Sequence, residues 1–228
     1  MVLITVAAVV IGGAVILLNR PSTPSTAGGD LISPPVMYSA DIVSGESLGR
    51  SDAPVVLSVW SDFQCPVCGR FVRDQYATLK TTFIDTGVLR IESHDIAILG
   101  AGDPNESLES AVGARCAGEQ NRYWQYHDLV FWNQGRENRG DYGSEFLASV
   151  ANRAGVDRAA WDSCVAADTV RAAIKSETAA AAGQGINSTP TLSLNGSTPT
   201  AGLPDRTTLM AQIQALAGTA SPGASTTP

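Results

Sequence analysis

The clearest hydrophobic pattern in the chain starts at residue 55. Residues 55–61 form a short apolar, valine-rich run after an Ala-Pro turn, which predicts a buried β-strand. Apolar residues then recur at spacings typical of one helix face, at Val72, Tyr76, Leu79 and Phe83. Gly87 ends this helix, and residues 88–91 resemble a second strand. The order strand, helix, strand predicts a right-handed crossover and a parallel strand pair.

From about residue 105 to residue 184 the apolar spacing is helical throughout, which predicts an inserted all-helical subdomain of about 80 residues. After the insertion we expect a strand, a hairpin turn and a closing helix, at residues 191–194, Asn195-Gly196 and 204–217. The predicted fold class is therefore α/β, a strand–helix–strand unit interrupted by helices.

The two ends of the chain differ in composition from this body. Residues 2–18 carry no charged side chain, and a helix of that length, about 26 Å, is just long enough to span a bilayer. We interpret residues 2–18 as a transmembrane signal anchor in the lipid bilayer. Residues 19–40 and 218–228 are rich in Pro, Ser, Thr and Gly, which predicts a flexible linker and a disordered tail. One domain, residues 41–217, remains between them.

The charge of the chain narrows the choice of partners. The formal net charge is −7, from 15 Lys and Arg against 22 Asp and Glu, and the only lysines are Lys80 and Lys175. Proteins that bind nucleic acid concentrate basic residues on one surface, and no basic cluster occurs in this sequence. We therefore expect no nucleic-acid partner.

Cysteine chemistry is the strongest functional signal. Cys65 and Cys68 flank Pro66-Val67 where the predicted strand turns into the helix, and proline suits the first helical position. At a helix N-terminus Cys65 is favoured as a thiolate, so we expect an exposed attacking Cys65 and a shielded resolving Cys68. An inert bridge and half of a zinc site are the alternatives. Structural zinc needs further closely spaced ligands, so we predict no metal.

Three motifs together identify a family resemblance. They occur in order along the chain and read Ser61-Asp62-Phe63-Gln64-Cys65-Pro66-Val67-Cys68, Trp124-Gln125-Tyr126-His127-Asp128 and Gly185-Ile186-Asn187-Ser188-Thr189-Pro190-Thr191. The combination resembles the DsbA-like thiol–disulfide oxidoreductases, which have a thioredoxin-like fold with a helical insertion. A single Cys-x-x-Cys motif is weak evidence, whereas this set covers the chain from about residue 41 to residue 217.

The resemblance implies a site and an activity. Cys65 and Cys68 would form the redox-active disulfide, with Pro190 as a cis-proline packed against their sulfurs. The Thr189 backbone would pair with a bound substrate segment, and we assign Phe63 to substrate binding with Thr189 and Pro190. The implied function is the introduction of disulfides into unfolded or reduced exported proteins, without a cofactor. A quinone-linked membrane reoxidant of the DsbB or vitamin K epoxide reductase kind would restore the disulfide.

The other two cysteines, Cys116 and Cys164, lie in the helical insertion. A second redox relay and a structural disulfide are both open, and we favour the disulfide because neither cysteine has a Cys-x-x-Cys partner. Some anchored bacterial relatives have a second disulfide here. Disulfides persist in oxidising compartments, so we expect the catalytic domain on the extracytoplasmic side of the cell membrane. Arg20 after the anchor favours the opposite topology, but long domains translocate largely regardless of such charges.

Two other functions remain as alternatives. One is a disulfide reductase or isomerase of the same fold, and the other is a non-catalytic binding or chaperone module. Of the two histidines, we expect His127 to be structural. His94 lies at the end of a predicted strand, and a structural role is favoured over a place in the active-site groove. Many relatives carry a buried acid at the position of Val59, and Asp62, Glu92 or water are the possible replacements.

The residue between the cysteines predicts the strength of the oxidant. The most oxidising relatives have a histidine that stabilises the thiolate, and Val67 does not provide that interaction. A less stable thiolate makes the reduced form less stable, so we expect a milder oxidant than the extreme members. Redox titration against glutathione measures this, and a potential more oxidising than about −120 mV would contradict it.

Overall fold

The computed structural model describes residues 31–220. The predicted anchor over residues 2–18, most of the predicted linker and residues 221–228 lie outside this range. Within residues 31–220, no helix is both long and apolar enough to cross a bilayer. The last helix continues to Ala220, so the predicted tail cannot begin at residue 218.

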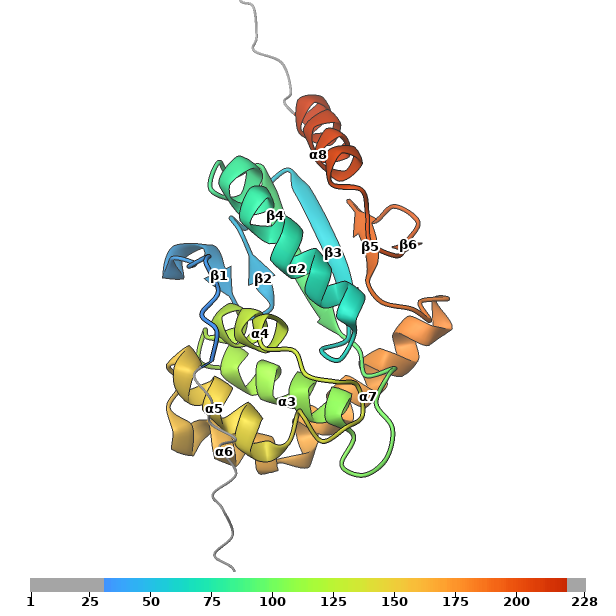
Figure 1. Ribbon diagram of the computed structural model, residues 1–228. Coiled ribbons are helices and arrows are strands. Elements are labelled where there is room, and N and C mark those ends of the chain that lie inside the picture. Colours follow the sequence, from blue (N-terminus) through green and yellow to red (C-terminus); the bar gives the residue numbers. More distant parts are fainter. Residues whose placement is uncertain (1–30, 221–228) are drawn as a thin grey trace, which may run out of the picture.

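A mixed six-stranded sheet forms the centre of the fold (Figure 1). Its strands are β1 (Val43–Ser44), β2 (Ser47–Leu48), β3 (Val55–Ser61), β4 (Leu89–Asp95), β5 (Thr191–Leu194) and β6 (Thr200–Ala201). Their order across the sheet is β1-β2-β4-β3-β5-β6. The β3–β4 pair is parallel, as predicted, and the other four pairs are antiparallel.

The helices form two groups (Figure 1). Helix α2 (Pro66–Leu79) continues into one π-helical stretch, η2 (Lys80–Ile84), and α8 (Arg206–Ala220) ends the described chain. The insertion contains α3 (Glu106–Gly118), α4 (Tyr123–Trp132), α5 (Ser144–Ala154), α6 (Arg158–Ala166) and α7 (Asp168–Gly183). The predicted helical insertion over about residues 105–184 is therefore confirmed. A 3-10 turn, η1 (Ala40–Ile42), precedes β1.

The alternation along β3 decides which side of the sheet holds the reactive cysteines. Leu57 and Val59 are fully buried in the main core together with Cys68 and the apolar residues of α2. The alternate side chains of β3 face the other way, where Trp60 packs with a small cluster that includes Ile186.

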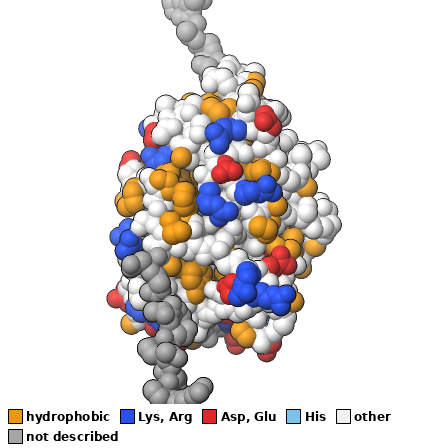
Figure 2. All heavy atoms as spheres, viewed as in Figure 1, with side chains coloured by type: hydrophobic (Ala, Val, Ile, Leu, Met, Phe, Trp, Pro, Cys, Tyr) orange, Lys and Arg blue, Asp and Glu red, His pale blue; other side chains and the backbone are white. Residues whose placement is uncertain are grey.

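Basic and acidic side chains are interspersed on the face of the molecule shown in Figure 2.

Residues 31–40 correct the prediction of a free linker. The Tyr38 side chain is buried, and its hydroxyl donates a 2.7 Å hydrogen bond to Asp128 Oδ2 on α4. Ile32 N–H donates to Asn133 Oδ1 at 2.7 Å, and the Asn133 side chain donates back to the Ile32 carbonyl. The Pro- and Ser-rich composition suggested a solvated tether, but these reciprocal bonds fix the segment on the helical layer.

Two further elements differ from the predicted pattern. The β1–β2 hairpin, with a positive φ at Gly45, has only two residues in each strand and leaves almost no periodic signal. The alanine-rich stretch over residues 165–182 is divided at Ala167, whose backbone is extended between α6 and α7. Asp168 then begins α7.

The Cys116–Cys164 disulfide is formed and joins α3 to α6, with Cα atoms 5.7 Å apart. It closes a loop with a sequence separation of 48 residues inside the insertion. Cys116 is fully buried in the core, so the bridge ties α6 to a helix that packs against α4, α5 and α7.

We predict that the double substitution Cys116→Ala and Cys164→Ala lowers the free energy of unfolding by about 4 kcal/mol, the chain-entropy value for a loop of this length. Guanidinium unfolding of the oxidised proteins measures the change, and the variant should keep its Cys65–Cys68 exchange. A loss below about 1 kcal/mol would contradict the predicted role of the bridge.

Candidate active site

Cys65 and Cys68 lie where β3 ends and α2 begins. Cys65 is the N-cap residue of α2, and Pro66 occupies the first helical position, where a missing N–H costs nothing. The Cys68 backbone N–H donates to Cys65 Sγ at 3.4 Å. The sequence prediction of a cysteine at the helix N-terminus is therefore confirmed, and the Cys65 sulfur is the atom that caps the helix.

Cys65 is more enclosed than predicted. Both cysteines are free thiols; Cys65 keeps 4% of its surface exposed and Cys68 keeps none. The expectation of an openly exposed Cys65 is corrected, because the turn before β5 covers the sulfur and the thiol donates to the Thr189 carbonyl at 3.3 Å. Cys65 is still the more accessible of the two thiols, as predicted.

The two thiols have opposite acidities. The Cys68 thiol, hydrogen-bonded to the Cys65 sulfur, lowers the pKa of Cys65 to about 6, and the first N–H groups of α2 favour the same thiolate. Burial raises the pKa of Cys68 well above its ordinary value, and its hydrogen bond to Cys65 raises it further. Near neutral pH the pair therefore holds one ionised sulfur and one thiol.

The Thr189–Pro190 turn completes the site. The peptide bond between these residues is cis, and Pro190 is buried. Strand β5 pairs antiparallel with β3, which brings the turn to the end of β3 where Cys65 lies. The Pro190 carbonyl accepts a 2.7 Å hydrogen bond from the Gly202 N–H, which ties the turn to the chain after β6.

Asp62 holds the loop that precedes Cys65. Its Oδ2 accepts from the backbone N–H groups of Ile98 and Leu99, and its Oδ1 accepts from Gln64 N–H and the Ser107 hydroxyl. All four distances lie between 2.7 and 2.9 Å. With both oxygens engaged, Asp62 is a brace for the loop and not a free buried acid.

Two glutamines missed by the sequence analysis brace the same loop. Gln134 donates to the carbonyls of Phe63 and Cys65, each at 2.9 Å, although it is 69 residues from Cys65 in the chain. Gln64 accepts from the Asn138 N–H at 2.7 Å. The approach of Gln134 requires a glycine at position 69, because a Cβ there would lie 1.9 Å from Gln134 Oε1.

Phe63 is not available to a substrate, so its predicted binding role is corrected. Its side chain is 1% exposed and stacks on Phe131 with ring centroids 5.0 Å apart. It also packs edge-on against His127, which is fully buried with Nδ1 2.8 Å from Asp128 Oδ1. The structural role expected for His127 is confirmed, and Phe63 belongs to the same aromatic layer.

The remaining polar candidates lie away from the sulfurs. His94 stacks on Trp60 at 4.7 Å, on the sheet face opposite Cys68, so it does not line the site. Glu92 shares that face and pairs with Arg90 at 2.8 Å. Within residues 31–220, no three His, Cys, Asp or Glu side chains are grouped so that they would hold a metal ion.

The fold and the site together define a thioredoxin-like protein with a Cys-x-x-Cys centre and a cis-proline. A sequence model of the family described as Thioredoxin matches residues 43–214, and the chain belongs to that family.

Curated proteins that resemble this chain include several named for disulfide bond formation. Disulfide bond formation protein D of Bacillus subtilis is 28% identical over 101 residues, which are 41% of this chain and 45% of that protein. The chain spans about half the length of the curated relatives it matches.

Two solved structures share the fold over most of the chain. BdbD from Bacillus subtilis in its oxidised form has a TM-score of 0.68 at 20% identity, covering 78% of this chain and 99% of that one. Wolbachia pipientis alpha-DsbA1 has a TM-score of 0.62 at 19% identity, covering 77% and 92%. The predicted thioredoxin-like α/β fold with its helical insertion is thus confirmed.

The lowered pKa of Cys65 generates a direct prediction. In the reduced protein, alkylation of Cys65 by iodoacetamide should rise with pH around a midpoint near 6, while buried Cys68 stays unmodified. Peptide mapping by mass spectrometry reads both positions, and the Cys65→Ser variant is the control. A midpoint near the ordinary value of 9.0 would contradict the proposed geometry.

The same shift links pH to stability. The folded pKa lies below the unfolded one, so between about pH 6 and 9 the unfolded chain binds the additional proton. The reduced protein should therefore gain stability as the pH rises through this range and lose it as the pH falls through 6. Guanidinium unfolding of reduced protein at several pH values measures the trend, which should be absent in Cys65→Ser.

Proposed function

We propose that the protein is a thiol–disulfide oxidoreductase that introduces disulfides into exported proteins. The observation that carries this proposal is the asymmetric pair at the start of α2, an acidic Cys65 that caps the helix and a fully buried Cys68. A relative named for disulfide bond formation and the shared fold with DsbA structures support the same reaction.

The reaction consists of two exchanges at sulfur. A substrate thiolate attacks Cys65 Sγ of the oxidised protein, the Cys65–Cys68 bond breaks, and the electron pair leaves on Cys68, which takes up a proton. A second substrate thiolate then attacks the substrate sulfur of the mixed disulfide. The substrate disulfide forms, and Cys65 departs as a thiolate that the N-terminus of α2 stabilises.

The stability of that departing thiolate sets the direction. A thiolate favoured in the reduced protein makes the reduced form more stable and the disulfide form a better oxidant. The Thr189–Pro190 turn contacts Cys65, and the Thr189 carbonyl oxygen lies 3.3 Å from the Cys65 sulfur. In the oxidised protein Cys65 has no thiol proton to donate, so the Thr189 carbonyl is free to accept a hydrogen bond from a substrate backbone N–H.

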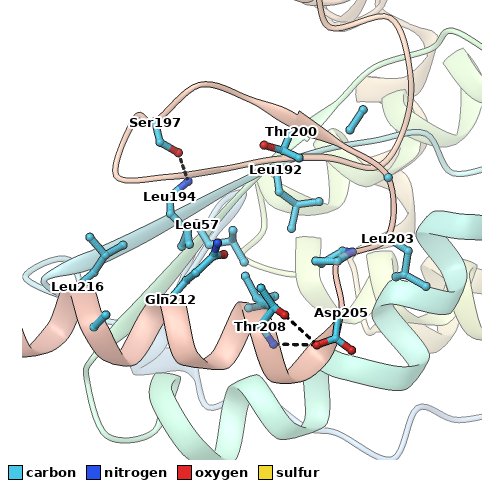
Figure 3. A pocket seen from close by; sticks show the side chains of 15 residues that line it. Leu57, Leu192, Leu194, Ser197, Thr200, Leu203, Asp205, Thr208, Gln212 and Leu216 are labelled. Atoms are coloured by element: carbon cyan, nitrogen blue, oxygen red, sulfur yellow. Dashed lines mark hydrogen bonds between the residues drawn. The ribbon is translucent and has the colours of Figure 1, made fainter.

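An apolar groove next to this turn is suited to unfolded segments. It has a volume of about 610 Å³ and lies between α8 and the β5–β6 edge (Figure 3). Its floor is Leu57 and Leu192 from the sheet, and Leu203 at its rim is 37% exposed. Gly202 connects the rim to the Pro190 carbonyl. Apolar walls with few polar groups fit many sequences, so we expect low sequence selectivity.

The proposal includes a location and a reoxidant. The Cys116–Cys164 disulfide is typical of oxidising compartments, which supports an extracytoplasmic catalytic domain. The uncharged run over residues 2–18 supports attachment to the cell membrane by a single helix. A membrane reoxidant of the DsbB or vitamin K epoxide reductase kind would act in the same bilayer, where anchoring raises its effective concentration.

The function predicts a trapped intermediate. The Cys65 thiol of Cys68→Ala is first converted to its mixed disulfide with glutathione. Reduced exported proteins with one free thiol then displace glutathione from Cys65, and without Cys68 to attack the new mixed disulfide they should accumulate as adducts. Non-reducing electrophoresis and mass spectrometry identify them, and Cys65→Ser with Cys68→Ala is the matched control. Adducts that form equally in the control, or none with reduced protein substrates, would contradict the proposal.

A further inference from the structure

Gln134 holds the backbone on both sides of the peptide that joins Gln64 to Cys65. It follows α4 in the helical insertion, and its side-chain nitrogen donates to the carbonyls of Phe63 and Cys65 at 2.9 Å each. These two carbonyls flank the Gln64–Cys65 peptide. A single amide group from a distant part of the chain therefore fixes the segment from which the reactive sulfur extends.

Arg73 on α2 fixes the direction of this amide. Its Nη1 donates to the Gln134 side-chain oxygen at 3.2 Å and also donates to the Phe131 carbonyl. A guanidinium has only donors and a carbonyl only accepts, so the amide oxygen faces Arg73 and the amide nitrogen faces the loop. A hydrogen bond from a charged donor is stronger than one between neutral groups. Gln134 is therefore held at both ends of its amide.

Gly69 leaves the space in which the amide lies. It is buried on α2, one turn before Arg73, and its backbone is helical, so the backbone itself does not require glycine there. A Cβ at this position would lie 1.9 Å from Gln134 Oε1 and 2.7 Å from Arg73 Nη1. Alanine would therefore displace both side chains. It would keep the 3.1 Å hydrogen bond that the Gly69 N–H donates to the Cys65 carbonyl.

The segment held by Gln134 determines where the Cys65 sulfur lies in the reduced protein. Cys65 has an extended backbone with a ψ of 115°, which makes it the N-cap of α2 and brings its sulfur to the Cys68 N–H. In the oxidised protein the covalent bond to Cys68 holds the sulfur. In the reduced protein that bond is open, so the contact that favours the thiolate depends on the hydrogen bonds of the Cys65 backbone.

The charged and titratable groups bonded to this segment do not replace Gln134. Cys68 lies on α2 and donates its N–H to the Cys65 sulfur, and the Asp62 carboxylate accepts from the Gln64 N–H and from three other donors. Arg73 reaches Gln134 and not the loop. Because glutamine does not titrate, a pH-dependent effect of its removal has to act through the neighbouring thiols.

We propose, on the basis of the function proposed above, that Gln134 positions Cys65 for thiol–disulfide exchange. Its amide holds the Cys65 backbone so that the sulfur caps α2 when the disulfide is open. Arg73 directs the amide, and Gly69 provides the space for it. Gln134 bonds to the backbone and not to the sulfurs, so it is a positioning residue.

The first test replaces Gln134 by alanine and measures Cys65 alkylation and the equilibrium with glutathione between pH 5 and pH 8. A less stable thiolate raises the alkylation midpoint above about 6 and makes the reduced form less stable. At pH 8 we expect the equilibrium to shift about tenfold towards the disulfide form, the factor for one pKa unit. At pH 5 Cys65 is protonated in both proteins, so we expect no shift.

Gln75→Ala is the matched control for Gln134→Ala. Gln75 is buried on α2, and its side-chain nitrogen donates to the Pro204 carbonyl at 2.8 Å, so the control removes the same kind of bond away from Cys65. Both variants should unfold at lower guanidinium concentration than the wild type, but only Gln134→Ala should change the alkylation midpoint and the glutathione equilibrium. Values for Gln134→Ala that coincide with Gln75→Ala at every pH would overturn the proposal.

Gly69→Ala provides a second test that removes no hydrogen-bonding group, and alanine favours a helix more than glycine does. We expect Gly69→Ala to shift the equilibrium in the same direction. Combined with Gln134→Ala it should shift the equilibrium no further than Gln134→Ala alone, because the amide that it displaces is already absent. An unchanged equilibrium in Gly69→Ala, or additive shifts, would overturn the positioning role. A wild-type protein that does not exchange with glutathione would instead overturn the proposed function, and this inference with it.

Discussion

The hydrogen bond from the Cys68 backbone N–H to the Cys65 sulfur is the interaction on which the chemistry depends. It exists only because Cys65 caps α2, and α2 begins there because Pro66 follows directly after the loop from β3. The loop is held in turn by the acceptor oxygens of Asp62 and the donating amide of Gln134. The acidity of one sulfur is thus set by the geometry of a strand end, a brace and a helix start.

Residues of the helical insertion make most of the hydrogen bonds that hold this loop. Ser107 comes from α3, and Gln134 follows α4, so the loop before Cys65 is fixed by side chains far away in sequence. The Cys116–Cys164 disulfide ties α3 to α6 within the same insertion. Opening of the insertion would therefore release the active-site loop as well as the helices.

Local patterns were sufficient for the parts of the fold with strong periodicity or strict turn chemistry. Strand 55–61, the start of α2 at Pro66 and the helical insertion follow the sequence prediction. The two-residue strands β1 and β2 are too short to show alternation, and the docking of Tyr38 depends on Asp128, 90 residues away. Phe63 resembled a groove residue beside the cysteines, but its direction is decided by Phe131, which only the folded helices bring near.

The central claim is that the Cys65–Cys68 disulfide passes to a protein thiol pair. The most direct measurement mixes the oxidised protein at pH 7 with an equimolar reduced peptide that carries two cysteines, and counts free thiols on both by mass spectrometry after acid quench. The account predicts that the peptide gains one disulfide for each protein molecule whose Cys65 and Cys68 become thiols. Peptide thiols that remain free, or that are lost without reduction of Cys65 and Cys68, would contradict it.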